Sequence, residues 1–129
     1  MKRLLRSMIV HYSTHMMVLA IVVIAYGTLS PSEYLVPSRL WSFDKVLHFS
    51  SFGTLTGLIW LHLYKIGNTG RVLDVKALFW GIFAGLLVEM LQYYLPINRL
   101  ADVLDFMANV LGSITAVGFL KLIRFNRQN

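Results

Sequence analysis

Two aspartates and an asparagine interrupt an otherwise apolar stretch late in the sequence. Asp102, Asp105 and Asn109 are spaced by three and four residues. On a helix with about 100° per residue, they lie within about 60° of one another on one face. Carboxylates placed this way can transfer protons or bind a ligand. Such groups are costly inside a membrane, where they usually indicate a functional site.

Two earlier apolar segments carry polar groups of complementary chemistry. One begins with Asp44, Lys45 and His48, and the other ends with Glu89 and Gln92. The histidine is four residues after the aspartate and three after the lysine, so it can neighbour either on one helix face. A histidine beside a carboxylate is a natural general base, and a lysine can hold a phosphate or carboxylate.

The spacing predicts two kinds of site residue. The candidate catalytic residues are His48, Glu89 and Asp105. The candidate ligand-binding residues are Asp44, Lys45, Gln92, Arg99, Asp102 and Asn109. No obvious nucleophile accompanies them, because Ser50 and Ser51 follow His48 in no recognisable motif. Whether the site is catalytic therefore stays open.

We expect no resident cofactor. The sequence contains no cysteine, which excludes disulfides and thiolate chemistry. The alternative is a divalent metal held by His48 with Asp105, Glu89 or Asp102. One histidine with carboxylates is a poor set for zinc and an acceptable one for magnesium or manganese.

The elements that must position these groups are four apolar segments. Hydrophobic residues make up 57% of the 129 residues and charged residues 14%. That balance is typical of an integral membrane protein. Spans of about 20 residues fit at 8–26, 44–64, 75–95 and 102–123. We predict an all-α polytopic membrane protein, a compact bundle of four transmembrane helices forming a single domain over residues 1–129.

The N-terminal basic residues before the first span also resemble a secretion signal, but the length of that span and the three further spans favour a membrane helix. Alternating spans place both termini and residues 65–76 on one side. That side carries nine basic residues: Lys2, Arg3, Arg6, Lys65, Arg71, Lys76, Lys121, Arg124 and Arg127. The other side carries Arg39, Lys45 and Arg99. The positive-inside rule therefore predicts cytoplasmic termini. The C-terminal basic residues then contact membrane lipids, and we expect no nucleic-acid partner.

The polar groups then lie at the outer ends of the second, third and fourth spans. At about 1.5 Å rise per residue, His48, Gln92 and Asp105 lie about 4–6 Å below the surface, and Glu89 and Asn109 roughly 10 Å. This predicts a polar pocket open to the cell exterior or periplasm. Small residues at four-residue steps predict close helix approach. They are Gly53 and Gly57, Gly81 and Gly85, and Ala108, Gly112 and Ala116.

The order of these motifs resembles the VanZ-like family. The motifs are Asp44-Lys45-x2-His48-Phe49, Glu89-x2-Gln92, Pro96-x2-Arg99 and Asp105-x3-Asn109-x2-Gly112. The resemblance implies a small multi-span cell-envelope protein of the bacterial cytoplasmic, or inner, membrane. The family's namesake is associated with resistance to the glycopeptide antibiotic teicoplanin, so an antibiotic-resistance role is one expectation.

We predict that the pocket binds, with or without modification, a lipid-linked or cell-wall-related anionic ligand. The alternative is a non-catalytic structural or partner-binding protein whose polar cluster only fixes helix packing. An interhelical hydrogen bond in a membrane is worth about 0.6 kcal/mol. An Asp or Lys at mid-helix costs about 2.5–3.5 kcal/mol on insertion. Because the insertion cost exceeds the gain from hydrogen bonds, we favour a ligand-binding or catalytic site over a purely structural cluster. The sequence does not identify the ligand or the oligomeric state.

Overall fold

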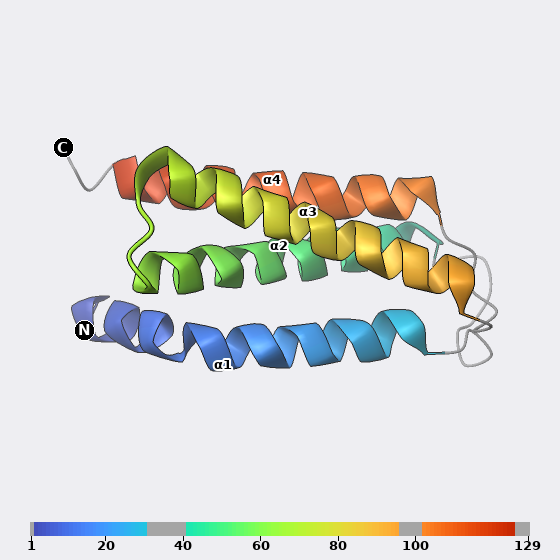
Figure 1. The fold of residues 1–129 in the computed structure, drawn as a ribbon, viewed down its shortest axis with the longest axis horizontal. Helices are drawn as coiled ribbons and strands as arrows, with labels where there is room; N and C mark the ends of the chain where they lie inside the picture. Colours follow the sequence, from blue (N-terminus) through green and yellow to red (C-terminus); the bar gives the residue numbers. More distant parts are fainter. Residues whose placement is uncertain (1, 31–40, 96–101, 126–129) are drawn as a thin grey trace.

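The computed structural model describes four helices over residues 2–30, 41–95 and 102–125. They are α1 (Lys2–Leu29), α2 (Trp41–Lys65), α3 (Gly70–Tyr94) and α4 (Val103–Phe125). The helices alternate in direction, so α1 begins and α4 ends at the same end of the bundle as the turn between α2 and α3 (Figure 1). The described ranges contain no strand. The prediction of an all-α four-helix bundle is confirmed.

Three helices within the described ranges are long and apolar enough to cross a membrane. These segments are His11–Leu29, Phe43–Lys65 and Val103–Arg124. The outer surface of the bundle is correspondingly apolar, with Val22, Phe79 and Leu122 all exposed. Large apolar side chains on the outside are what a lipid environment requires. The three segments indicate a membrane protein, while the assignment of α3 as a further span stays a prediction.

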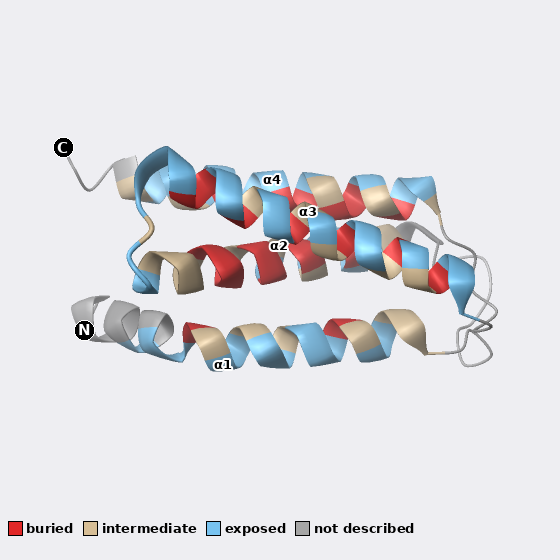
Figure 2. Cartoon of the chain, in the orientation of Figure 1, coloured by how far each residue is buried: buried red, intermediate tan, exposed pale blue. Residues whose placement is uncertain are grey.

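Helix α2 lies at the centre of the bundle. It packs against all three other helices, and its contact with α4 is the most extensive. Its buried face includes Phe52, Leu55 and Ile59, which pack with Leu73 of α3 and Val117 of α4. Figure 2 shows these buried faces turned toward the bundle interior. A central α2 places the residues at its N-terminal end between α3 and α4.

Glycines allow these helices to approach closely. A Cβ on Gly112 of α4 would collide with the carbonyl oxygen of Phe49 and lie 3.1 Å from the backbone nitrogen of Gly53. A Cβ on Gly85 of α3 would lie 3.0 Å from the Cβ of Asn109. Glycine removes the side chain that would keep two backbones apart, as the small-residue spacing predicts. The close approach places polar side chains of α2, α3 and α4 within hydrogen-bonding range.

Candidate functional site

The candidate site lies where the N-terminal ends of α2 and α4 meet the C-terminal end of α3. The cluster consists of Asp44, Lys45 and His48 from α2, Glu89 from α3, and Asp102, Asp105 and Asn109 from the start of α4. His48, Glu89, Asp105 and Asn109 are all buried. The structure thus brings together residues that are up to about 60 positions apart in the sequence, as the predicted topology requires.

Lys45 joins α2 to the beginning of α4. Its Nζ donates to Oδ2 of Asp102 at 2.9 Å and to Oδ1 of Asp105 at 2.7 Å. The other oxygen of Asp102, Oδ1, accepts a hydrogen bond from the backbone nitrogen of Leu104 at 2.8 Å. That contact makes Asp102 the N-cap of α4, where a carboxylate satisfies an otherwise unpaired backbone donor. Asp102 therefore has a structural role that its spacing alone does not reveal.

The electrostatics of Asp102 follow from these contacts. Asp102 precedes the apolar segment of α4, and its side chain is 29% exposed. The hydrogen bond from the Lys45 ammonium, followed by that from the Leu104 backbone, lowers the pKa of Asp102 below its ordinary value of 3.8. The carboxylate is therefore ionised throughout the neutral range. Lys45 is shared between Asp102 and Asp105, so another anion would have to compete with them.

A chain of hydrogen bonds fixes the imidazole of His48. Its Nδ1 lies 3.0 Å from Oδ1 of Asn109, and Nδ2 of the same amide lies 3.5 Å from Oε1 of Glu89. A carboxylate only accepts hydrogen bonds, so the Asn109 amide must turn its NH2 toward Glu89 and its oxygen toward His48. An oxygen acceptor at 3.0 Å places the proton of a neutral imidazole on Nδ1. The lone pair of His48 is then on Nε2.

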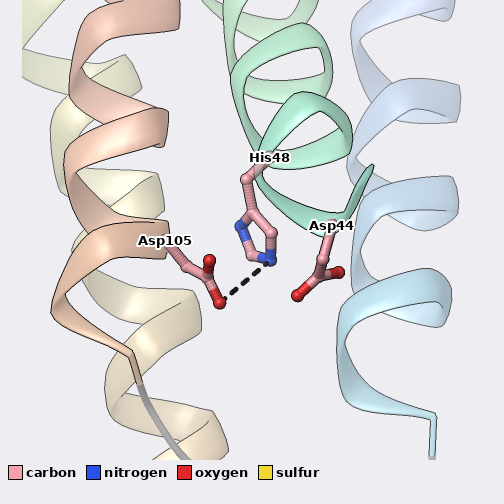
Figure 3. A group of neighbouring side chains, drawn as sticks. All are labelled: Asp44, His48 and Asp105. Carbon is pink, nitrogen blue, oxygen red and sulfur yellow. Dashed lines mark ion pairs between the residues drawn. The ribbon is translucent and has the colours of Figure 1, made fainter. Parts of the chain in front are cut away.

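The Nε2 atom of His48 faces two carboxylates (Figure 3). It lies 4.0 Å from Oδ2 of Asp105. Asp44, one turn earlier on α2, points toward the same space. One oxygen of each aspartate and one ring nitrogen of His48 lie within 4.8 Å of one another. The spacing of residues predicts that these three groups line one pocket, but which of their atoms face one another depends on the side-chain conformations of two helices.

Glu89 and Gln92 also make contacts that the sequence-based layers do not include. Oε2 of Glu89 accepts a hydrogen bond from the backbone nitrogen of Asp102 at 3.3 Å, while Oε1 lies 3.5 Å from Nδ2 of Asn109. One carboxylate therefore reaches both the start of α4 and Asn109, the residue predicted to lie at its own level. Nε2 of Gln92 donates to the carbonyl oxygen of Thr28 at 2.9 Å, which ties α3 to α1. The predicted residue Arg99 lies outside the described residues.

A second charged cluster at the opposite end of the bundle was not predicted. Asp74 of α3 accepts from Arg124 of α4 at 3.0 Å and from the indole nitrogen of Trp60 of α2 at 2.9 Å. The guanidinium also lies 5.8 Å from the centre of the Trp60 ring, within cation–π range. The available signal was that Asp74 is the single acidic residue on the predicted basic side. This cluster connects the same three helices as the candidate site.

The fold and the polar cluster define a small helical membrane protein with ionisable groups gathered at one end of its bundle. The family model described as VanZ/LLP1 matches residues 5–124, and the chain belongs to the VanZ/LLP1 family. The match confirms the resemblance seen in the sequence motifs and extends it over nearly the whole chain. No curated protein and no solved structure gives a significant match.

Proposed function

We propose that this VanZ/LLP1-family protein binds a lipid-linked or cell-wall-related component of the envelope at its polar cluster. The observation that carries the proposal is the burial of His48, Glu89 and Asp105, from three different helices, at one end of an apolar bundle. Each group is costly to bury in such a setting. Helix packing alone offsets little of that free-energy cost, because hydrogen bonds between membrane helices contribute about 0.6 kcal/mol each.

We further propose that the cluster faces the cell exterior or periplasm from the bacterial cytoplasmic membrane. The turn between α2 and α3 lies at the opposite end of the bundle from the cluster (Figure 1). Around that turn the chain carries Lys65, Arg71 and Lys76, with Arg124 at the same end. The positive-inside rule places this end in the cytoplasm. The ligand would then enter from the outer leaflet or from the cell wall.

The chemistry of the cluster fits a ligand with an anionic headgroup and several hydrogen-bonding groups. Lys45 and the Asn109 amide provide donors, and His48 can accept or donate a proton. A headgroup would compete with Asp102 and Asp105 for the Lys45 ammonium, which the two carboxylates now share. If the protein also modifies this ligand, the reaction needs a proton transfer, which His48 with Glu89 or Asp105 would have to supply.

A specific observation favours the alternative that the cluster fixes helix packing. Lys45, Asp102 and Asp105 satisfy one another across α2 and α4 without a ligand. A purely structural cluster predicts that neutralising a carboxylate weakens folding, whereas a binding site predicts that it weakens ligand retention. The two functions therefore separate in one pair of measurements.

The experiment is lipid retention by the purified protein. Protein extracted in mild detergent with its native lipids is examined by native mass spectrometry, beside the variants Glu89→Gln and Asp105→Asn. We expect the wild type to retain a lipid-linked species that both variants lose, with melting temperatures nearly unchanged. Incubation with extracted envelope lipids then distinguishes a binder from an enzyme, because only an enzyme gives a product of new mass.

The control is Asp74→Asn, the same kind of change in the opposite charged cluster. It is expected to weaken folding while leaving lipid retention per folded protein unchanged. Collapse of the fold in both site variants, or equal lipid retention in all proteins, would rule out the binding function.

A further inference from the structure

We propose that Asp44, His48 and Asp105 form a binding site for a divalent cation of the Mn²⁺ or Mg²⁺ class. The proposal differs from the sequence-based expectation of no cofactor. It also differs from the alternative metal set, because Asp44 replaces Glu89 and Asp102. It stands on two observations, the orientation of the His48 ring and the convergence of the three donor groups.

The first observation is the orientation of the His48 ring. Its Nδ1 faces the oxygen of the Asn109 amide, so Nε2 is the ring nitrogen that faces Asp105 and Asp44. An imidazole nitrogen and carboxylate oxygens are common ligands of divalent cations. His48 is 4% exposed, so water gives little screening of charge at this point.

The second observation is the spacing of the donor atoms. Ligand atoms about 2.1 Å from an octahedral cation are about 3.0 Å apart when adjacent and about 4.2 Å apart when opposite. Nε2 of His48 and Oδ2 of Asp105 are separated by 4.0 Å, and all three donors lie within 4.8 Å of one another. The separation is too long for a hydrogen bond and lies in the range for two ligands of one cation.

The surroundings hold the proposed ligands in place. Lys45 binds Oδ1 of Asp105, which leaves Oδ2 directed toward His48. The chain from Glu89 through Asn109 fixes the ring orientation and the tautomer of His48. Groups that orient metal ligands through hydrogen bonds in this way raise metal affinity. Among the described residues, the cluster contains four carboxylates and one lysine, a balance that favours a cation.

The proposed cation extends the proposed function without depending on it. A cation at this position would offer an anionic headgroup a second positive charge beside Lys45, which two aspartates already share. That bridging role rests on the proposed function. Binding of the metal itself does not, so the two can be tested separately.

The test uses Mn²⁺ alone with the full chain in detergent micelles after treatment with EDTA. Electron paramagnetic resonance measures the loss of the free Mn²⁺ signal during titration, and pulsed measurements detect coupling of bound Mn²⁺ to ¹⁴N. We expect one Mn²⁺ per chain, with ¹⁴N coupling from His48. Mg²⁺ should compete for the site. Asp44→Asn and Asp105→Asn should each weaken Mn²⁺ binding at least 10-fold, and His48→Gln should remove the nitrogen coupling.

Two matched controls accompany these variants. Asp74→Asn makes the same change in the opposite charged cluster, away from the three-residue set, and is compared per folded protein. His15→Gln removes an exposed histidine of α1. Both should retain the nitrogen coupling and bind Mn²⁺ within about threefold of the wild type.

Absence of stoichiometric Mn²⁺ binding by the wild type would overturn the proposal, as would bound Mn²⁺ without ¹⁴N coupling. Both measurements use the unaltered protein, so they decide the question even if a variant fails to fold. Retention of the envelope lipid without Mn²⁺ binding would refute the cation site and leave the proposed function standing. Mn²⁺ binding without lipid retention would refute the proposed function and leave the cation site standing.

Discussion

The Nδ1 atom of His48 lies 3.0 Å from Oδ1 of Asn109, across the interface between α2 and α4. The pair connects the imidazole of His48 with an amide that orients the ring. Through Nδ2, Asn109 also reaches Glu89 of α3, so a single amide serves three helices.

Replacing this amide should destabilise the bundle. Asn109→Ala leaves the buried groups of His48 and Glu89 without their shared partner, and each unsatisfied buried group costs about 1–3 kcal/mol. We expect a lower free energy of unfolding in a denaturing-detergent titration. Thr115→Ala is the control, since the exposed Thr115 hydroxyl donates only to a carbonyl of its own helix. Equal stability of the two variants would contradict the role given to Asn109.

Removing Lys45 should be partly compensated by removing one of its partners. Lys45→Met leaves Asp102 and Asp105 facing each other without a cation, whereas Asp102→Asn keeps the N-cap and removes one negative charge. In a double-mutant cycle we expect a coupling of about 0.5–3 kcal/mol, as is usual for residues in contact. Additive losses of unfolding free energy would mean that the ion pair contributes nothing to folding.

The pairing of Asp102 with Lys45 also predicts a pH dependence. Because the folded-state pKa of Asp102 is lowered below 3.8, its stabilisation is fully present above that value. It is lost as the pH falls through the lower, folded-state pKa. The wild type should therefore melt at a higher temperature than Asp102→Asn at neutral pH, and the difference should shrink at acidic pH. A difference that grows on acidification would show the opposite sign and refute the assignment.

The contact between Gly53 and Gly112 predicts strong sensitivity to one methyl group. Gly112→Ala places a Cβ against the carbonyl of Phe49, so α2 and α4 must move apart. Overpacking of this kind typically costs about 1–3 kcal/mol. Gly118→Ala is the matched control on the same helix, because its Cβ would meet nothing within 4 Å. Comparable melting temperatures for the two variants would be incompatible with close backbone packing.

The topology predicts where a reporter is active. A C-terminal green fluorescent protein fusion should fluoresce, and an alkaline phosphatase fusion at the same point should be inactive, because both termini are predicted to be cytoplasmic. A phosphatase fusion after Leu95, at the outer end of α3, is the positive control. An active C-terminal phosphatase would reverse the proposed orientation and place the polar cluster at the inner face.

Hydropathy and spacing were sufficient for the helices and for most of the cluster. Alternating spans bring Lys45 and Asp105 to one end of the bundle whatever the exact tilt of each helix, so their proximity follows from the sequence. The contact of Gln92 with Thr28 could not be predicted in this way, because it depends on the rotation of α3 about its own axis. Helix rotation is set by packing at contacts such as Gly85 against Asn109. Spacing within one helix carries no such information.

The cluster at the other end bears on how the protein is assembled. Asp74 and Arg124 are separated by 50 positions, and Arg124 lies in the last turn of α4. During synthesis, Asp74 can therefore pair with the guanidinium of Arg124 only after nearly all of α4 has been made. Until then Trp60 is the contact available to Asp74 from within the hairpin. The cluster therefore forms only once the last turn of α4 has been made, and loss of that turn would leave Asp74 without the Arg124 guanidinium.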